Sequence, residues 1–373
     1  MHVRVPLFRV FMPETVTGAL DRVLFSGYIG EGPQVQRFED ALGERIANPQ
    51  VLAVNSGTSA LQLALRLAGV AGGEVITSPM TCVATNQAIL AAGGTVVWAD
   101  VDPWTGNLSV EDVARRITPR TRAILPVHWA GYPCDLEELG ALAAARGLRV
   151  IEDAAHAFGA TYHGRPIGSH SDFVCFSFQA IKHVTTGDGG AVACRSADAC
   201  RRGRRLRWFG LDRAVESALR WDQDIAEAGY KFHMNDLAAT IGLEQLPHAS
   251  ANLARYRANA AAYDAAFAGL DSVRPLRYAA DRESARWIYT LRVRDRRGFA
   301  DHLRRDGIEA SRVHTRNDRY TVFAAARTPL PGLDEFDAEQ ISIPCGWWLT
   351  ADDVGRVIDS VRRFAAAGRP ASR

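Results

Sequence analysis

Short apolar runs alternate with helical stretches along the first two-thirds of the chain, and this alternation constrains the fold more than any other feature. Runs this short and this continuously apolar are typical of strands that are covered on both faces. We predict strands at 74–77, 95–99, 123–127, 149–152, 173–176 and 190–193, and helices at 59–68, 86–92 and 136–146. The pattern therefore predicts an α/β fold with a largely parallel sheet, whose active site lies at the carboxyl ends of the strands.

The pattern changes after about residue 246. An Ala-rich helical stretch at 252–270 is followed by a strand at 287–293 and by helices at 299–305 and 351–367. We expect a large domain at 1–246 and a smaller α+β domain at 247–373, with the N-terminal segment 1–25 packed on the small domain.

Composition excludes several classes of protein. The net charge of +2 gives no support for a nucleic-acid partner, and the absence of a long apolar run argues against a membrane span. Six cysteines without a CxxC pair predict neither a metal site nor a disulfide scaffold. Since the first residues also lack a signal-peptide pattern, we expect a reduced, cytoplasmic protein.

Lysine is almost absent. Of 44 basic residues only Lys182 and Lys231 are lysines, so the other 42 are arginines. A coding bias towards Arg explains the surface, but such a bias leaves Lys mainly where Arg would fail. A buried Lys can become a neutral nucleophile, whereas Arg keeps its proton. The two lysines are therefore candidate chemical positions.

Lys182 follows a predicted buried strand and precedes a turn containing Gly187, Gly189 and Gly190. This places an amine at the active edge of the sheet, where a carbonyl cofactor can be held as a Schiff base. The alternative is an ordinary surface Lys beside a hairpin, and the scarcity of lysines weighs against it.

Three further features fit a cofactor with a pyridine ring and a phosphate. Asp153 ends a predicted strand and can pair with a ring nitrogen, although it can also simply cap a helix. His156, one turn later, can meet the ring, or it can be an ordinary helix-face histidine. Residues 55–61 open a helix with small polar residues that suit a phosphate, and the hydroxyl of Ser177 can add to that site. No glycine fingerprint of a dinucleotide site is present, so the combination indicates pyridoxal phosphate.

With these motifs the chain resembles the DegT/StrS-type sugar aminotransferases, a family of fold type I enzymes that use pyridoxal 5'-phosphate. The matching stretches are 30–33, 38–39, 56–61, 152–159, 177–182, 187–190 and 234–246. The resemblance covers residues 25–246 well and extends more loosely to the end of the chain. It implies a seven-stranded, mostly parallel sheet in the large domain and a homodimer with active sites at the interface.

The resemblance also implies roles for the catalytic residues. Lys182 would form the Schiff base and carry protons, while the cofactor alternates with pyridoxamine 5'-phosphate. Asp153 would pair with the pyridinium nitrogen, and His156 would lie beside the ring and its phenolic oxygen.

For the phosphate, the resemblance implies the amides of Gly57 and Thr58 and the hydroxyl of Ser177. Lys231 of the partner subunit would complete this site; the alternative is an ordinary surface Lys. Many relatives carry an aromatic residue at the position of Cys82, so here the contact with the ring is smaller.

Several residues are candidates for substrate contacts. The basic run 201–210 is either a solvated helix face or a diphosphate site, and for the latter we single out Arg207 and Arg213. The polar segment 313–318 is either an ordinary loop or a cover over the substrate that uses His314 and Arg316. Tyr28 is a further candidate.

The resulting expectation is transamination of a keto sugar, nucleotide-linked, with an amino acid donor, L-glutamate. Three alternatives remain open: a keto-cyclitol acceptor, a pyridoxamine-phosphate-dependent sugar dehydratase, and a non-catalytic regulator on the same fold. In such a dehydratase a His replaces the Schiff-base Lys, and His183 is adjacent to Lys182.

Overall fold

The computed structural model of the chain describes residues 4–213, 215 and 222–367. Its centre is a seven-stranded sheet in the order β1-β9-β8-β5-β4-β2-β3. The strands are β1 (Val51–Val54), β2 (Glu74–Thr77), β3 (Thr95–Trp98), β4 (Thr121–Leu125), β5 (Arg149–Asp153), β8 (Phe173–Ser177) and β9 (Gly190–Cys194). Strand β9 runs opposite to the other six strands of this sheet. The predicted α/β fold with a mostly parallel sheet is confirmed, and β1 is a strand that the pattern did not predict.

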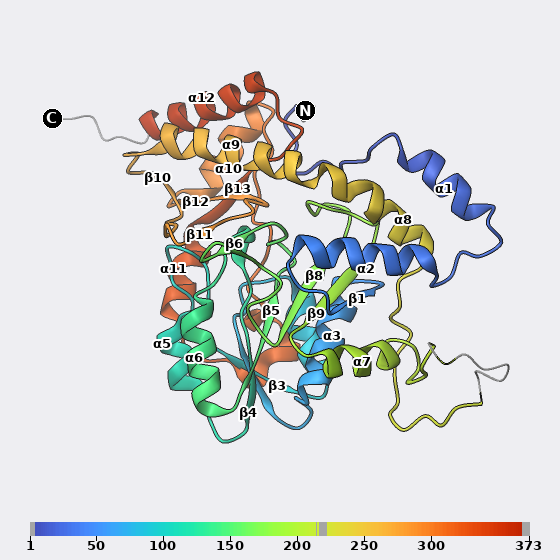
Figure 1. The fold of residues 1–373 in the computed structure, drawn as a ribbon. Helices are drawn as coiled ribbons and strands as arrows, with labels where there is room; N and C mark the ends of the chain where they lie inside the picture. Colours follow the sequence, from blue (N-terminus) through green and yellow to red (C-terminus); the bar gives the residue numbers. More distant parts are fainter. Residues whose placement is uncertain (1–3, 214, 216–221, 368–373) are drawn as a thin grey trace.

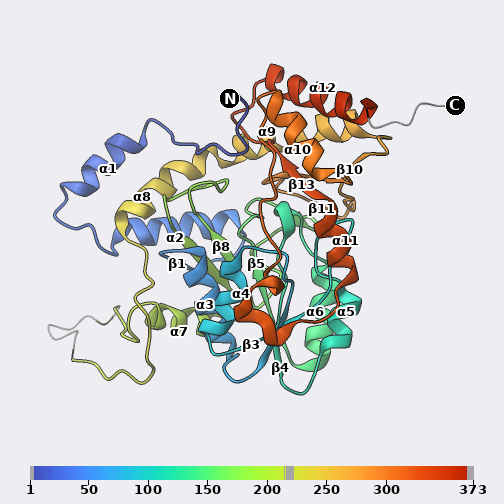
Figure 2. The ribbon, with the colours of Figure 1, turned by 180° about the vertical axis from the view of Figure 1, so that it is seen from behind.

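Helices cover both faces of this sheet, as Figure 1 and Figure 2 show from opposite sides. Strand β1 illustrates why: Leu52 and Val54 belong to one apolar core, and Val51 and Ala53 belong to the other. The first core contains residues of α3 (Gly57–Ala68), α4 (Val83–Ala91) and α7 (Ala197–Leu206). The second contains residues of α2 (Pro33–Arg45), α5 (Val110–Arg116), α6 (Leu136–Arg146) and α8 (Asp236–Gln245). Strands that are apolar on both faces are buried between these layers, as the sequence pattern predicts.

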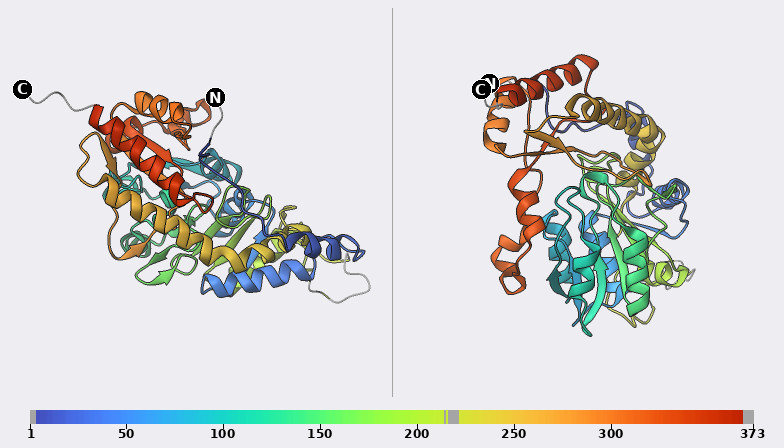
Figure 3. Two further views of the ribbon diagram at one scale, coloured as in Figure 1. Left: turned by 90° about the horizontal axis from the view of Figure 1, so that it is seen from above. Right: turned by 90° about the vertical axis from the view of Figure 1, so that its left-hand side faces the viewer.

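The C-terminal part has its own sheet and core, seen above the large sheet in the right-hand view of Figure 3. Its antiparallel sheet has the order β10-β12-β13. The strands are β10 (Val273–Pro275), β12 (Tyr289–Val293) and β13 (Gln340–Ile343), and the helices are α9 (Ala249–Phe267), α10 (Arg296–Arg305), α11 (Pro331–Glu339) and α12 (Ala351–Ala367). Side chains of α9, α10, α12 and all three strands form one apolar core. The turn η2 (Leu246–His248) joins α8 to α9 at the position where we expected the chain to divide.

Smaller elements connect the two parts. A third sheet has the order β11-β6-β7, formed by β6 (Thr161–Tyr162), β7 (Arg165–Pro166) and β11 (Arg282–Glu283). The other 3-10 turns are η1 (Trp129–Gly131), η3 (Asn317–Arg319) and η4 (Thr321–Ala326).

The N-terminal segment runs across both parts. The amides of Arg4 and Val5 donate to the carbonyl of Gly307, at 2.9 and 3.0 Å, and Val5 is buried in the C-terminal core. The helix α1 (Val16–Leu24) lies alongside α8 in Figure 1. No helix in the described ranges has the length and apolar character needed to cross a membrane.

Candidate active site

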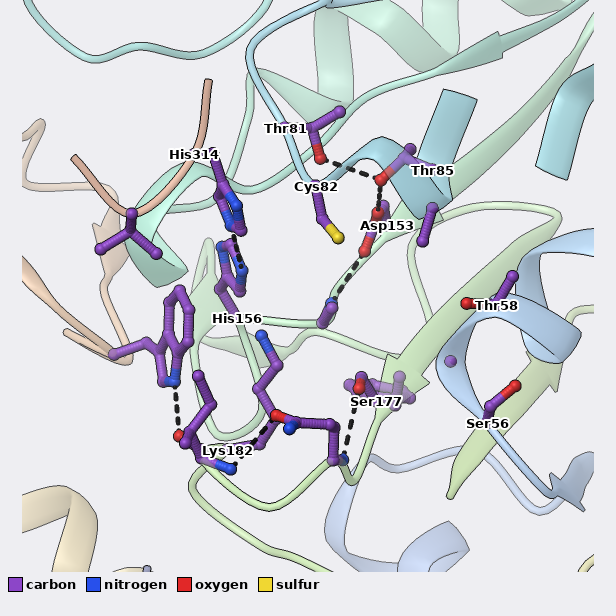
Figure 4. A pocket seen from close by; sticks show the side chains of 18 of the residues that line it. Ser56, Thr58, Thr81, Cys82, Thr85, Asp153, His156, Ser177, Lys182 and His314 are labelled. Carbon is purple, nitrogen blue, oxygen red and sulfur yellow. Dashed lines mark hydrogen bonds between the residues drawn. The ribbon is translucent and has the colours of Figure 1, made fainter. Parts of the chain in front are cut away.

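A cavity of about 460 Å³ lies at the carboxyl ends of β5 and β8. Asp153 is the last residue of β5 and Ser177 is the last residue of β8, and the two strands pair directly. The start of α3 and the turn after β8 form further walls. The predicted residues that line the cavity are Gly57, Thr58, Cys82, Asp153, His156, Ser177, Lys182 and His314. Figure 4 shows most of these side chains around one space.

Asp153 is held in a fixed orientation at the base of the cavity. Its side chain is 4% exposed, and its Oδ2 accepts a hydrogen bond of 2.7 Å from Thr85 Oγ1. Its Oδ1 accepts a hydrogen bond of 3.1 Å from the amide of Ala155. Since Thr85 gives its proton to Asp153, the 2.9 Å contact between the hydroxyls makes Thr81 the donor to Thr85. This chain of donors fixes the direction of the carboxylate and stabilises its charge.

Lys182 lies in the turn after β8, with its amide 2.9 Å from the carbonyl of Gln179. Burial lowers the pKa of Lys182 to about 8, and the negative charge of Asp153 acts in the opposite direction. A neutral amine is therefore accessible near neutral pH, as a nucleophile or a base requires. The adjacent His183 is buried, and its Nε2 lies 2.9 Å from the carbonyl of Ala285. Of the two neighbours, Lys182 is the one that lines the cavity.

Two histidines and a tryptophan form a cluster of nearly parallel rings beside Lys182. The His156 ring lies 3.9 Å from the Trp287 ring at an angle of 14°, and the His314 ring lies 5.2 Å from His156 and 6.2 Å from Trp287. The Nε2 atoms of His156 and His314 are 3.3 Å apart, so one donates to the other. Burial lowers the pKa of His156 and lowers that of His314 to about 3, so both rings are neutral. The buried Nδ1 of His156 has no hydrogen-bond partner among the described residues and is available to a ligand.

The start of α3 forms a cradle for a small anion. The side chain of Ser56 caps the helix by accepting a hydrogen bond of 3.0 Å from the amide of Ser59. The amides of Gly57 and Thr58 come earlier in the first turn, where helical N–H groups lack intrahelical acceptors. A Cβ at position 57 would lie 2.8 Å from the Cβ of Ser177, so only glycine allows this close approach.

The arrangement fits pyridoxal phosphate, whose groups meet matching partners. The cradle suits the phosphate, Asp153 suits the protonated ring nitrogen, and the unpaired Nδ1 of His156 suits the phenolic oxygen. Lys182 suits the carbonyl carbon. Cys82 lines the same cavity and is exposed to it, without the ring that many relatives place there.

Arg207 does not line the cavity. It is 1% exposed, and its guanidinium pairs with Glu31 and Glu39. A guanidinium enclosed by carboxylates of its own chain joins α7 to the N-terminal part.

Three other predicted substrate residues also lie outside the cavity. Arg213 and Tyr28 lie beside a separate hollow of about 180 Å³, where both bind Glu31. Arg316 is buried against Asp318, with bonds of 2.8 and 2.7 Å, and also pairs with Asp334. Among these candidates the structure brings only His314 into the cavity.

Lys231 is exposed and does not line the cavity of its own chain. Its carbonyl accepts a hydrogen bond of 3.2 Å from Asn55 Nδ2, immediately before the cradle. Lys231 therefore belongs to a segment that borders the cradle.

Sequence reasoning missed several residues of the site. Thr81 precedes the N-cap of α4 and Thr85 lies in its first turn, and two hydroxyls so close to the start of a helix were a usable signal. Trp287 and Arg312 reach the cavity from the C-terminal part, and Phe8 reaches it from the N-terminal segment. No local pattern marks these three, because only the tertiary fold brings them to the site.

Similarity to known proteins extends over almost the whole chain. Residues 12–362 match the sequence profile of the DegT/DnrJ/EryC1/StrS aminotransferase family. The sugar aminotransferase CalS13 of Micromonospora echinospora is 45% identical, with a TM-score of 0.93 over 96% of this chain and 99% of that one. The PLP form of Spr1654 from Streptococcus pneumoniae, a putative sugar aminotransferase, is 27% identical, with a TM-score of 0.90 over 98% of this chain and 100% of that one. The spore coat polysaccharide biosynthesis protein SpsC of Bacillus subtilis is 34% identical over 91% of both chains.

Proposed function

Because the chain belongs to the DegT/DnrJ/EryC1/StrS aminotransferase family, which depends on pyridoxal phosphate, we propose that it transfers an amino group from L-glutamate to a nucleotide-linked keto sugar. The observation that carries the proposal is the meeting of Lys182, Asp153 and the α3 cradle in one cavity. The similarity to sugar aminotransferases supports a sugar as the acceptor.

The residues of the cavity have separable tasks in this reaction. When bound, pyridoxal phosphate supplies a ring that takes up electrons from the substrate carbon. The carboxylate of Asp153 keeps the ring nitrogen protonated, and Thr85 keeps that carboxylate in place. The amides of Gly57 and Thr58, with Ser177, bind the phosphate.

Lys182 is the group that moves protons. Its pKa of about 8 lies close to neutral pH, so its Nζ can both accept a proton from the substrate carbon and return one to it. The neutral pair of His156 and His314 limits the positive charge around this amine, since neither ring is protonated near neutral pH.

We also infer a cytoplasmic homodimer with active sites at the interface. Lys231 borders the cradle from outside its own cavity, which suits a phosphate contact made across an interface. Exposed apolar side chains on the same flank, such as Phe25 (83% exposed) and Ile29 (49% exposed), give such an interface apolar surface. All six cysteines are free, as in a reducing compartment.

The proposal is tested with the Lys182→Ala variant, and with Arg205→Ala on the exposed face of α7 as a matched control. We expect the wild type and the control to show the visible absorbance of lysine-bound cofactor and to release 2-oxoglutarate as amino sugar forms. Lys182→Ala should lose both. Retention of the absorbance and turnover in that variant would contradict the assignment.

The acceptor is tested by offering nucleotide-linked keto sugars and a keto-inositol in parallel. Amination of the nucleotide-linked compounds supports the proposal, whereas amination of keto-inositol alone indicates a cyclitol enzyme. Deoxygenation without a new amine indicates a dehydratase, although the position of His183 outside the cavity argues against one. Tight binding of a protein partner without any turnover indicates a regulator.

A further inference from the structure

Trp287 connects the turn that carries Lys182 to a second segment of the chain. It lies just before β12, is 1% exposed, and its amide donates to the carbonyl of Ala130 at 3.0 Å. Its indole Nε1 donates a hydrogen bond of 2.9 Å to the carbonyl of Ile181, the residue that precedes Lys182. The indole is thus bonded to the turn that carries the lysine, and its own backbone is anchored to a different segment.

The face of the same indole lies against the lysine amine. Lys182 Nζ is 3.7 Å from the centre of the Trp287 ring, well within the range of a cation–π contact. The same indole also stacks with His156 at 3.9 Å and with Phe8 at 5.2 Å. A ring held by stacking and by two hydrogen bonds has little freedom to move away from the amine.

Other charged and titratable groups near Lys182 do not replace this contact. Those that act on it or feel its charge are Asp153, Cys82, His156, His183 and His314. Burial lowers the pKa values of the three histidines, so none of them is a cation near neutral pH. Asp153 has its own task and is already bound to Thr85. No salt bridge to Lys182 occurs among the described residues, and the contact that the structure shows for its amine is the face of the indole.

The ε-amine of a Schiff-base lysine must be held in position while it is not bound to the cofactor. Its amine is bound to the cofactor at some stages and free at others, and its four-carbon stem is flexible. An amine that swung away when free would no longer be aligned for proton transfer at the substrate carbon.

We propose that Trp287 is a positioning residue that holds the ε-amine of Lys182 against its indole face whenever the amine is not bound to cofactor. The indole acts in two ways: its π face attracts the ammonium form, and its Nε1 fixes the backbone of the turn. The role in turnover rests on the proposed function, but the contact itself is a property of the cofactor-free chain.

The near absence of lysine makes the contact measurable. Trace acetylation of the cofactor-free, full-length chain over a pH series, read by peptide mass spectrometry, reports Lys182 directly, with Lys231 as the internal reference. Trp287 is replaced site-specifically by tryptophans with increasing numbers of fluorine atoms, which weaken the π face while nearly preserving size. The matched control is the same series at Trp98, which is also 1% exposed and packs on Phe323 instead.

We expect the labelling midpoint of Lys182 to fall stepwise with fluorination at Trp287, by roughly one pH unit for the full series. The sign follows because a weaker π face stabilises the ammonium less, while burial is unchanged. The Trp98 series should leave the midpoint unaltered. A midpoint that stays constant or rises across the Trp287 series would overturn the proposal, because burial alone would then explain the lysine.

A second measurement uses the holoenzyme. In the most fluorinated Trp287 protein we expect a lower single-turnover rate with L-glutamate and an unchanged KM, since the change affects proton transfer and not donor binding. A wild-type rate would contradict the positioning role. If the wild type aminates no keto sugar and does not react with L-glutamate, the proposed function fails, and the labelling series still decides the contact.

Discussion

Gly57→Ala tests whether the close approach of α3 to β8 forms the phosphate cradle. The added Cβ would lie 2.8 Å from the Cβ of Ser177, 3.1 Å from its Oγ and 3.3 Å from its Cα. The shortest contact is about 0.6 Å less than an ordinary one, which begins at 3.4 Å. Because a backbone atom and a short side chain form the obstacle, the clash cannot be relieved by turning a flexible chain aside.

The expected cost is that of overpacking, about 1–3 kcal/mol. Relief requires Ser177 and the first turn of α3 to move apart, which separates the amides of Gly57 and Thr58 from the hydroxyl of Ser177. If the cost falls on cofactor binding, it corresponds to roughly 5- to 150-fold weaker affinity. Titration of the cofactor-free protein with pyridoxal phosphate, followed by visible absorbance, measures this affinity, and urea unfolding measures stability.

Two other glycines provide matched controls. Gly140 lies inside α6 and Gly355 inside α12, and a Cβ at either position meets nothing within 4 Å. Alanine at these sites should raise the free energy of unfolding by up to about 1 kcal/mol through helix propensity alone, without changing cofactor affinity. If Gly57→Ala behaves like these controls, the cradle has been misidentified.

Further expectations concern charged groups. Lys182→Met should stabilise the cofactor-free chain by roughly 2–3 kcal/mol at pH 7, because the folded chain lowers the pKa of Lys182 from 10.5 to about 8 and thereby disfavours its charge. The unfolded chain binds more protons between these values, so the gain should shrink as the pH rises from 8 to 10.5; urea unfolding over this range measures it. Arg207→Met should cost about 3–5 kcal/mol of stability, since it leaves Glu31 and Glu39 without their buried partner. A change in KM for the sugar at full stability would instead restore Arg207 as a substrate contact.

The sequence is sufficient for much of the fold because the decisive signals are local. The strand at 149–152 was predicted from its own residues, and Asp153 ends this strand at the active edge of the sheet. Strand β1 was missed because its four residues gain their identity from β9, whose Val192 pairs with Leu52. That pairing joins distant parts of the chain, and no local periodicity encodes it.

The same distinction explains the site. Lys182 and Asp153 are marked by strand ends, which a sequence reveals. The surroundings of Arg207 could not be predicted because its sequence neighbours are basic, whereas the carboxylates that enclose it, Glu31 and Glu39, come from the N-terminal part. Trp287 was not identified because its importance depends on which residue its ring meets.

The choice between Arg and Lys follows the geometry of each site in this chain. Where carboxylates offer several oxygens to a planar fork, as Glu31 and Glu39 do, the chain has Arg207, whose fixed donors fit them and whose charge is permanent. Lys182 meets the opposite conditions: a ring face, burial, and a carboxylate already engaged by Thr85. A guanidinium there would keep its proton and could neither bond to a carbonyl carbon nor act as a base. Lysine is therefore retained at position 182, against the bias towards arginine, for a chemical reason. Lys231 is different, because an exposed cation beside the cradle only needs charge, which an arginine would also supply, so the scarcity of lysine argues less for this residue than for Lys182.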